Sequence, residues 1–278
     1  MTTINLYNGT HTGVFNEGTH RYKIDGIYQQ GVTSVLNATL HKAALMLWPM
    51  NEALKTLGAS WNNSDGWYLL GSDPITLKST DFQRAASAYL RKRDKGADVG
   101  SGVHLQVEKF LRDIQLGEAG NFVVDAPDLI KPYNAFKKWF KANDIEVIGI
   151  EQIVFSEKFK YAGTYDSLLK INGKIYLCDL KTTNASKDTP DGIYDDYFIQ
   201  LGAYYLAYKE ERDYLIKSTG EMEKINAAMP EIEDLLIISC KKDGKLHTKS
   251  AMDKGLTPEQ CAGAWRSCLE LFNFRRKK

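Results

Sequence analysis

Two turn signals in the second half of the chain constrain its fold more than any other feature. Asn172-Gly173 separates strand-like segments at 163–171 and 174–180, and Asp243-Gly244 separates similar segments at 235–240 and 246–250. Asn-Gly and Asp-Gly favour the tight turns of β-hairpins, whose central residues adopt positive φ. The sequence therefore predicts two hairpins, with one more strand over residues 146–155.

Segments with helical periodicity surround these strands. We predict helices over 81–95, 102–116, 131–143, 197–211 and 258–272. From residue 102 onward, helices alternate with a group of three strands and a group of two, which predicts an α/β sandwich with a mixed sheet. Residues 20–36 indicate a small hairpin around Asp25-Gly26, followed by a helix near 42–55 and a turn-rich stretch over 59–77. We therefore expect a mostly helical N-terminal cap over residues 1–100 and a core over 101–278.

Hydropathy and cysteine usage argue against several classes of protein, whereas net charge does not discriminate. The net charge of +1 argues neither for nor against a nucleic-acid partner, because acidic ligands and a basic groove can cancel. No apolar run is long enough to cross a bilayer, and the first residues lack the pattern of a secretory signal. We therefore expect a cytoplasmic protein, in a bacterium or a phage-infected host, with no membrane partner. The four scattered cysteines indicate idle thiols, not a zinc site or a disulfide framework.

The first hairpin carries the chemistry. Asp166 lies about six residues before the turn and Asp179 about six after it, so the two can face each other with Cβ atoms about 5 Å apart. Carboxylates that close repel each other unless a divalent cation lies between them, and oxygen ligands suit Mg²⁺ or Mn²⁺. Lys181 shares a strand face with Asp179, whereas Leu180 points toward the core. A lysine there can orient a water or stabilise negative charge on a phosphate.

Two helices carry further candidates. His104 and Glu108 share a helical face, as do Gln200 and Tyr204. His104 can supply a nitrogen ligand, and the second pair can brace the site or contact a DNA backbone. Each feature alone is weak, because a solvated ion pair or a packed histidine is the commoner outcome; their order and spacing together carry the information.

The ordered set resembles the RecB-type branch of the PD-(D/E)XK nucleases, a branch that includes phage-type and mitochondrial genome maintenance exonucleases. The resemblance rests on His104, on Gly163-Thr164-Tyr165-Asp166, on Asp179-Leu180-Lys181 and on Gln200 with Tyr204. Weaker similarity at residues 22–26, 32–36 and 45–48 extends it to roughly residues 20–210.

The resemblance implies a restriction-endonuclease-like core, with a central mixed sheet flanked by helices, and an active site that uses Mg²⁺ or Mn²⁺. It implies catalytic roles for Asp166, Asp179, Lys181, Gln200 and Tyr204. The implied metal ligands are His104, Asp166, Asp179 and the backbone carbonyl of Leu180, with Glu108, Glu151 and Thr182 as supporting candidates. No cysteine precedes Cys178, so we expect none of the iron–sulfur clusters that some relatives hold.

The implied function is a DNA exonuclease acting on single-stranded or end-processed DNA in phage-type replication, recombination or repair. A structure-specific endonuclease and a non-catalytic DNA-binding or assembly protein share this fold and stay open. Expected partners are DNA and a recombinase, single-strand-binding protein or replication protein, while the oligomeric state is open.

A basic stripe lies upstream of His104. Arg84, Arg91 and Lys95 are spaced by seven and four residues and so share one helical face. Such a stripe can track phosphates, although an ordinary solvated helix face is the commoner explanation.

Overall fold

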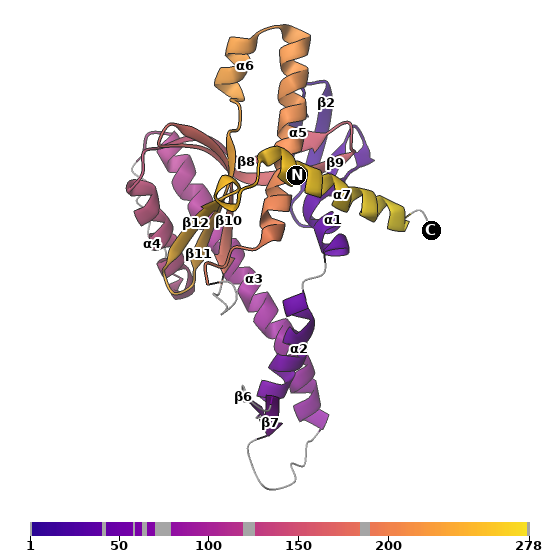
Figure 1. Cartoon of the computed structure of the whole chain (residues 1–278), viewed down its shortest axis with the longest axis vertical. Coiled ribbons are helices and arrows are strands. Elements are labelled where there is room, and N and C mark those ends of the chain that lie inside the picture. Colours follow the sequence, from indigo (N-terminus) through magenta and orange to yellow (C-terminus); the bar gives the residue numbers. More distant parts are fainter. Residues whose placement is uncertain are drawn as a thin grey trace. The chain divides into compact units, whose positions relative to one another are not determined.

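The computed structural model describes residues 2–40, 43–57, 59–62, 66–69, 79–118, 126–183 and 190–276 (Figure 1). The chain divides into two compact units. The first combines Met1–Leu40 with Gly102–Lys278, and the second comprises His41–Ser101. The first unit is therefore built from two segments that are far apart in the sequence.

A mixed β-sheet forms the centre of the first unit. Its order is β12 (Leu246–Ser250), β11 (Asp234–Lys241), β10 (Lys174–Thr183), β9 (Tyr161–Ile171) and β5 (Gln30–Gly31), and β8 (Ile145–Ser156) also pairs with β9. The β10–β11 and β5–β9 pairs are parallel, and the other pairs are antiparallel. The predicted α/β architecture with a mixed sheet is confirmed.

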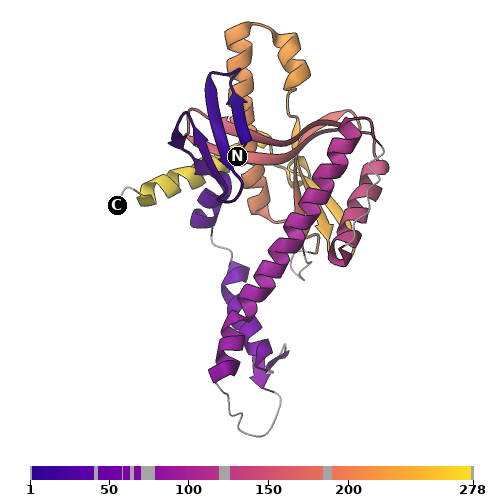
Figure 2. The ribbon, with the colours of Figure 1, turned by 180° about the vertical axis from the view of Figure 1, so that it is seen from behind.

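Helices cover both faces of this sheet, as the two opposite views show (Figures 1 and 2). On one face lie α1 (Val32–Thr39), α5 (Asp195–Thr219) and α7 (Pro258–Arg276), whose apolar residues share a core with β9, β10 and β11. The close approach of α5 to α7 depends on Gly202, where a Cβ atom would lie 2.3 Å from the backbone carbon of Cys261.

The other face carries α4 (Pro127–Lys141) and the last part of α3 (Ser79–Gln115). Phe110 of α3 packs edge-on against Phe136 and Phe140 of α4, with ring centroids 6.1 and 5.1 Å apart. The two helices predicted at 81–95 and 102–116 are instead one continuous helix. Glycine in a helix costs only about 1 kcal/mol, and Gly102 has a packing role because a Cβ there would lie 2.9 Å from the Leu129 side chain.

Both predicted hairpins of the second half are present. In the first, Asn172 and Gly173 have φ values of 50° and 88°, and Ile171 pairs with Lys174 across a two-residue turn. In the second, Gly244 has a φ of 92°. The short helix α6 (Met222–Ala228) was not predicted.

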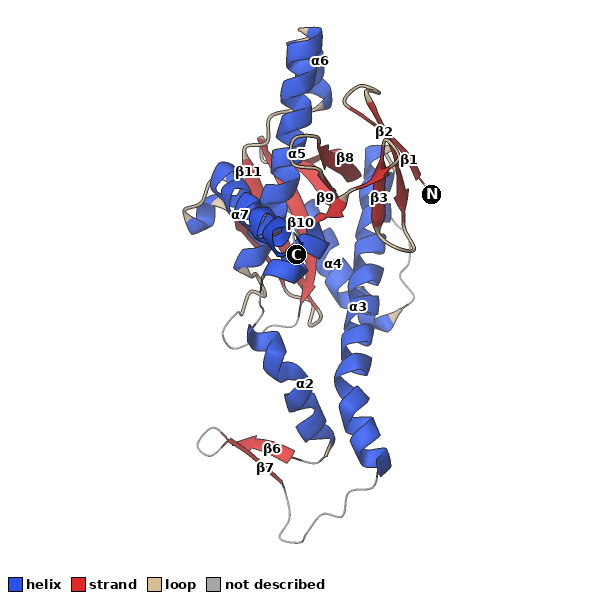
Figure 3. Cartoon of the chain, turned by 90° about the vertical axis from the view of Figure 1, so that its right-hand side faces the viewer, coloured by secondary structure: helices blue, strands red, loops and turns tan. Residues whose placement is uncertain are grey.

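The first forty residues differ most from expectation. A four-stranded antiparallel sheet contains β1 (Thr2–Leu6), β2 (His11–Asn16), β3 (Arg21–Ile24) and β4 (Ile27–Tyr28), of which Figure 3 labels the first three. The predicted hairpin around Asp25-Gly26 is confirmed, because Ile24 pairs with Ile27. A mostly helical cap over residues 1–100 is not clearly shown, because strands occupy much of residues 2–31.

This sheet is tied to the central one by buried polar contacts. The Tyr7 N–H donates to Glu211 Oε1 of α5 at 2.6 Å, and its hydroxyl donates to the Phe155 carbonyl at 3.0 Å. The hydroxyls of Tyr22 and Thr164 lie 2.9 Å apart. The segment before residue 40 therefore belongs structurally to the first unit.

The second unit comprises α2 (Ala43–Thr56), the hairpin of β6 (Ala59–Asn62) with β7 (Gly66–Leu69), and the beginning of α3. Helix α2 matches the predicted helix near 42–55. The role of residues 1–100 as a DNA-guiding cap stays a prediction.

The four cysteines are buried free thiols, as expected. Among the described residues, no helix combines the length and apolar character needed to cross a membrane.

Candidate active site

The two aspartates of the first hairpin lie where its strands separate. Pairing between β9 and β10 extends from Ile171↔Lys174 to Ser167↔Cys178. One further step in this register brings Asp166 opposite Asp179. In place of another ladder pair, the Leu180 N–H donates to Asp166 Oδ2 at 2.6 Å. The carboxylate of Asp166 is thus held at the point where β10 leaves β9.

One edge of β9 has a gap between two partner strands. Strand β8 pairs with β9 along nearly its whole length, so β10 and β5 must share the opposite edge. Strand β10 pairs with residues 167–171, and β5 pairs with residues 161 and 162. Residues 163–166, the segment Gly-Thr-Tyr-Asp, lie between these two partners. Side chains from other elements can therefore approach β9 at this gap.

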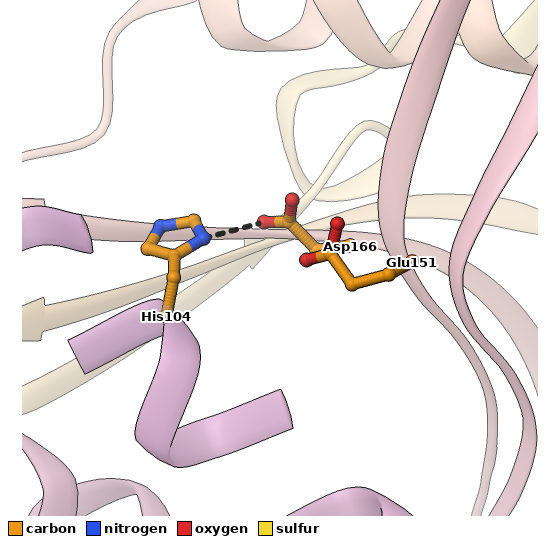
Figure 4. A group of neighbouring side chains, drawn as sticks. All are labelled: His104, Glu151 and Asp166. Carbon is orange, nitrogen blue, oxygen red and sulfur yellow. Dashed lines mark ion pairs between the residues drawn. The ribbon is translucent and has the colours of Figure 1, made fainter. Parts of the chain in front are cut away.

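Three side chains form a candidate metal site at Asp166. His104 of α3, Glu151 of β8 and Asp166 each offer a ligand atom, and these atoms lie within 4.8 Å of one another. His104 Nδ1 is 3.6 Å from Asp166 Oδ2, and Figure 4 shows the imidazole directed toward this carboxylate, with that of Glu151 beside it. All three are half-buried within a small pocket that Val107, Leu111 and Phe136 help to line.

Glu151 lies level with Asp166 in the register of β8 and β9, and it has an unusual backbone conformation. Its φ is +46°, and the ladder pairs the residues on either side of it, Ile150 with Ser167 and Gln152 with Tyr165, but not Glu151 itself. A left-handed conformation costs a residue with a Cβ about 1–2 kcal/mol, and such strain clusters at functional sites. Glu151 was predicted only as a supporting residue, because its place beside Asp166 depends on the long-range pairing of β8 with β9.

The electrostatics of the group fit a divalent cation. Burial raises the pKa of Glu151 to about 8, and the negative charges of Asp166 and Glu108 act in the same direction. Glu108 is itself paired with Arg112, whose Nε donates at 2.9 Å. One imidazole nitrogen and two mutually repelling carboxylates are a donor set suited to Mg²⁺ or Mn²⁺. The residues therefore fit the expected metal.

Asp179 lies outside this three-residue group and is paired with Lys181. Its side chain is 1% exposed, and Lys181 Nζ lies 2.6 Å from its Oδ2. Burial raises the pKa of Asp179 to about 6, while the ammonium of Lys181 opposes that rise. For Lys181, burial works to lower the pKa, but Asp179 and Asp166 outweigh it and the pKa is raised. Lys181 therefore carries a firmly held positive charge. A ligand role for Asp179 stays a prediction.

Lys181 continues into a hydrogen-bonded chain with α5. Its Nζ donates to Gln200 Oε1 at 3.2 Å, and Gln200 Nε2 donates to the Tyr204 hydroxyl at 2.9 Å. The Tyr204 ring packs against Gly163, where a Cβ atom would lie 2.5 Å from Tyr204 Cε1. The motif residues of β9, β10 and α5 thus form one connected network, which we call the Lys181 network (Asp179, Lys181, Gln200 and Tyr204).

The structure gives less support to the roles predicted for Leu180 and Thr182. Leu180 is buried and lines the pocket, and its backbone carbonyl as a ligand stays a prediction. Thr182 Oγ1 is buried without a hydrogen-bond partner among the described residues, and Thr182 is not in the pocket lining. A supporting role for Thr182 likewise stays a prediction.

The basic stripe belongs to the second unit. Arg84, Arg91 and Lys95 are all exposed. The Arg91 guanidinium donates to the Arg84 carbonyl at 2.8 Å and also to the Ser87 hydroxyl, so it is partly engaged by its own helix. DNA binding by these residues stays a prediction.

A comparison with protein families matches the model of the PD-(D/E)XK nuclease superfamily over residues 106–260. The match covers more than half of the chain and includes Glu151, Asp166 and the whole Lys181 network. No curated protein matches the chain by sequence. The superfamily match coincides with the mixed sheet and with the clustered motif residues described above. The chain therefore belongs to the PD-(D/E)XK nuclease superfamily.

Proposed function

We propose that this protein is a metal-dependent DNA exonuclease that hydrolyses phosphodiester bonds. The observation that carries the proposal is the juxtaposition of two groups at the gap in β9. A cation-binding donor set, His104 with Glu151 and Asp166, lies beside a fixed lysine, Lys181. Phosphodiester hydrolysis needs these two components, a site for a divalent cation and a positive charge near the reacting phosphate.

The three donor side chains would hold the cation, with Asp166 further restrained by the Leu180 N–H. A bound divalent cation would supply Lewis acidity toward a phosphoryl oxygen and would lower the pKa of a coordinated water. Helix α3 and strands β8 and β9 thus position the three ligand side chains. The strained backbone at Glu151 supports a functional role for this residue.

Lys181 would stabilise the negative charge that develops on the phosphate, or orient the attacking water. Asp179 keeps the ammonium charged, and Gln200 fixes its direction through a hydrogen bond. Tyr204 in turn holds Gln200. Preorganised charge of this kind needs no rearrangement during the reaction, which is the basis of its catalytic effect.

Exonuclease action is the finer part of the proposal, and its support is the resemblance to phage-type exonucleases. We further propose single-stranded or end-processed DNA as the substrate, in replication, recombination or repair alongside a recombinase, single-strand-binding protein or replication protein. Residues 41–101 would guide the strand, with Arg84, Arg91 and Lys95 contacting phosphates.

One assay tests the proposal. The protein is incubated with end-labelled DNA, single- and double-stranded and both linear and circular, with Mg²⁺ or Mn²⁺ and with excess chelator. We expect degradation of linear strands, sparing of circles and no activity in chelator. Asp166→Asn serves as the inactive control, and Lys224→Gln, which changes an exposed lysine on α6 that pairs with Glu221, as the charge-matched active control.

Rapid cutting of closed single-stranded circles would replace the exonuclease assignment with an endonuclease. Absence of cleavage with either metal, or full activity in chelator, would overturn the metal-dependent nuclease itself.

A further inference from the structure

An exposed aromatic residue lies on the β3–β4 hairpin, away from the catalytic residues. Tyr28 is 63% exposed and its neighbour Ile27 is 66% exposed. Tyr28 pairs with Lys23 across the hairpin. On β3, Tyr22 and Ile24 are buried whereas Arg21 and Lys23 are exposed, so both cations project from the face opposite the buried one. Because 63% of Tyr28 is exposed, core packing does not account for this aromatic side chain.

The two cations lie next to the Tyr28 ring. Arg21 Cζ is 5.8 Å and Lys23 Nζ is 5.7 Å from the ring centroid, both within cation–π range. These contacts orient the ring without covering it, because most of the side chain stays exposed. The result is a π surface bordered by positive charge.

A cavity of about 410 Å³ adjoins this ring. Ile27, Tyr28 and Phe159 give it apolar walls, Gln29 and Gln30 add amide groups, and Lys160 adds a cation. Arg276 also lies at this place, because its guanidinium donates to Gln30 Oε1 at 2.8 Å.

The neighbouring acidic groups are already paired. Asp25, which lines the cavity, lies 2.5 Å from His11 Nδ1, and Glu157 lies 3.5 Å from His11 Nε2. Lys160 and Arg276 lie at the cavity and Arg21 and Lys23 border the Tyr28 ring, so four cations accompany these two acids. An anionic ligand with flat, polar-edged rings complements such a surface.

We propose that this surface, the Tyr28 surface (Arg21, Lys23, Ile27, Tyr28 and Lys160), binds a single-stranded segment of DNA outside the catalytic site. One base stacks on Tyr28, the amide-lined cavity receives a neighbouring base, and the cations contact phosphates. Unpaired bases stack on aromatic side chains in a sequence-tolerant way, whereas the bases of a duplex already stack on one another. The inference rests on the proposed function and deepens it by specifying a single strand as the bound form.

The Tyr28 surface is separate from the metal site. Lys160 directly precedes β9, and five steps along that strand lead from Tyr161 to Asp166, a distance of about 17 Å at the usual rise of a strand. Substitutions at Tyr28 should therefore change binding without altering the residues that hold the cation.

Binding to fluorescein-labelled oligothymidylate, measured by anisotropy in EDTA, tests the inference because no cleavage occurs. Tyr28→Ala should raise the Kd for the single strand about fivefold to 150-fold, the range expected for one stacked base. Tyr28→Phe retains the ring and should stay within about twofold of the wild type. Arg21→Gln and Lys23→Gln should each reduce the salt dependence of log Kd by about 0.7, while Lys224→Gln should not.

Two further measurements locate the contact and verify the fold. An oligonucleotide that carries bromodeoxyuridine should photocrosslink to the peptide containing Tyr28. Each variant should melt at the wild-type temperature, because the substituted side chains are exposed.

The outcomes separate this inference from the proposed function. If the wild type cleaves DNA but Tyr28→Ala binds the single strand as tightly as the wild type, the Tyr28 surface is refuted and the nuclease stands. An equal loss of single-strand and duplex binding would also refute it, because stacking of an unpaired base would not be the cause. If the wild type binds single strands through Tyr28 but cleaves no DNA with either metal, the proposed nuclease function is refuted and the proposed Tyr28 surface stands. Absence of any DNA binding by the wild type would refute the inference.

Discussion

Gly163→Ala tests whether the Lys181 network depends on the close packing of β9 against α5. The added Cβ would lie 2.5 Å from Tyr204 Cε1 and 3.0 Å from Val32 Cγ2. Tyr204 is 3% exposed and Val32 is 1% exposed, so neither side chain can swing into solvent. The ring must therefore shift, and the hydrogen bond from Gln200 to its hydroxyl shifts with it.

The size of the effect follows from this geometry. Overpacking a core by one methyl group costs about 1–3 kcal/mol, and in a chain of this size each kcal/mol lowers the melting temperature by about 2–4 °C. We expect Gly163→Ala to melt about 2–12 °C below the wild type. Misplacement of Lys181 should lower kcat by about tenfold or more, approaching the 10²–10³ typical of losing one preorganised group.

Thermal melting and single-turnover cleavage of labelled single-stranded DNA measure the two effects on the same protein. Gly263→Ala on α7 is the matched control, because the nearest atom to its added Cβ is 4.0 Å away and the helix should gain stability. A Gly163→Ala variant that melts and cleaves like the wild type would show that Tyr204 packing has no part in positioning Lys181.

Three further predictions concern the metal site and the DNA path. Asp166→Asn and Lys181→Ala should each lower the cleavage rate by about 10²–10³ while circular dichroism shows a folded protein; wild-type rates in either would remove that residue from the mechanism. Glu151→Gln should raise the melting temperature in EDTA at pH 9, above the raised pKa of Glu151 of about 8, because there it removes a repelling charge beside Asp166. It should also shrink the stabilisation that Mg²⁺ gives the wild type, and an undiminished Mg²⁺ shift would exclude Glu151 as a ligand. Arg84→Glu combined with Arg91→Glu should raise KM for single-stranded DNA well before it lowers kcat, because both side chains are exposed cations that are not part of the candidate metal site. An unchanged KM in low salt would remove the stripe from the substrate path.

Much of the candidate active site could be predicted from short-range features of the sequence. The Asn172-Gly173 turn determines the register of the β9–β10 hairpin, and that register brings Asp166 and Asp179 to the same level. Helical spacing likewise predicted that Gln200 and Tyr204 share a face, and their side chains are hydrogen-bonded. Such features depend on residues close together in the chain, so periodicity and turn preferences capture them.

The sequence did not predict features that depend on contacts between residues far apart in the chain. Strand β5 contains only Gln30 and Gly31, and its partner on β9 lies about 130 residues further along the chain. Glu151 lies beside Asp166 and His104 because the pairs on either side of it bring β8 level with Asp166 of β9 and because α3 packs on that face, and both contacts join distant parts of the chain.

The two-segment construction of the first unit has a consequence for the order of events on the ribosome. Strands β1–β4 can pair with one another as soon as they emerge, but β5 must wait for Tyr161 and Ala162. At about 5–20 residues per second, that delay is roughly 7–26 s. Throughout it, Leu6, Tyr22 and Ile24 lack Phe155 and Ala162, the residues that complete their core. The nascent N-terminal sheet therefore exposes apolar surface during translation, and we expect chaperones that scan emerging chains to bind it there.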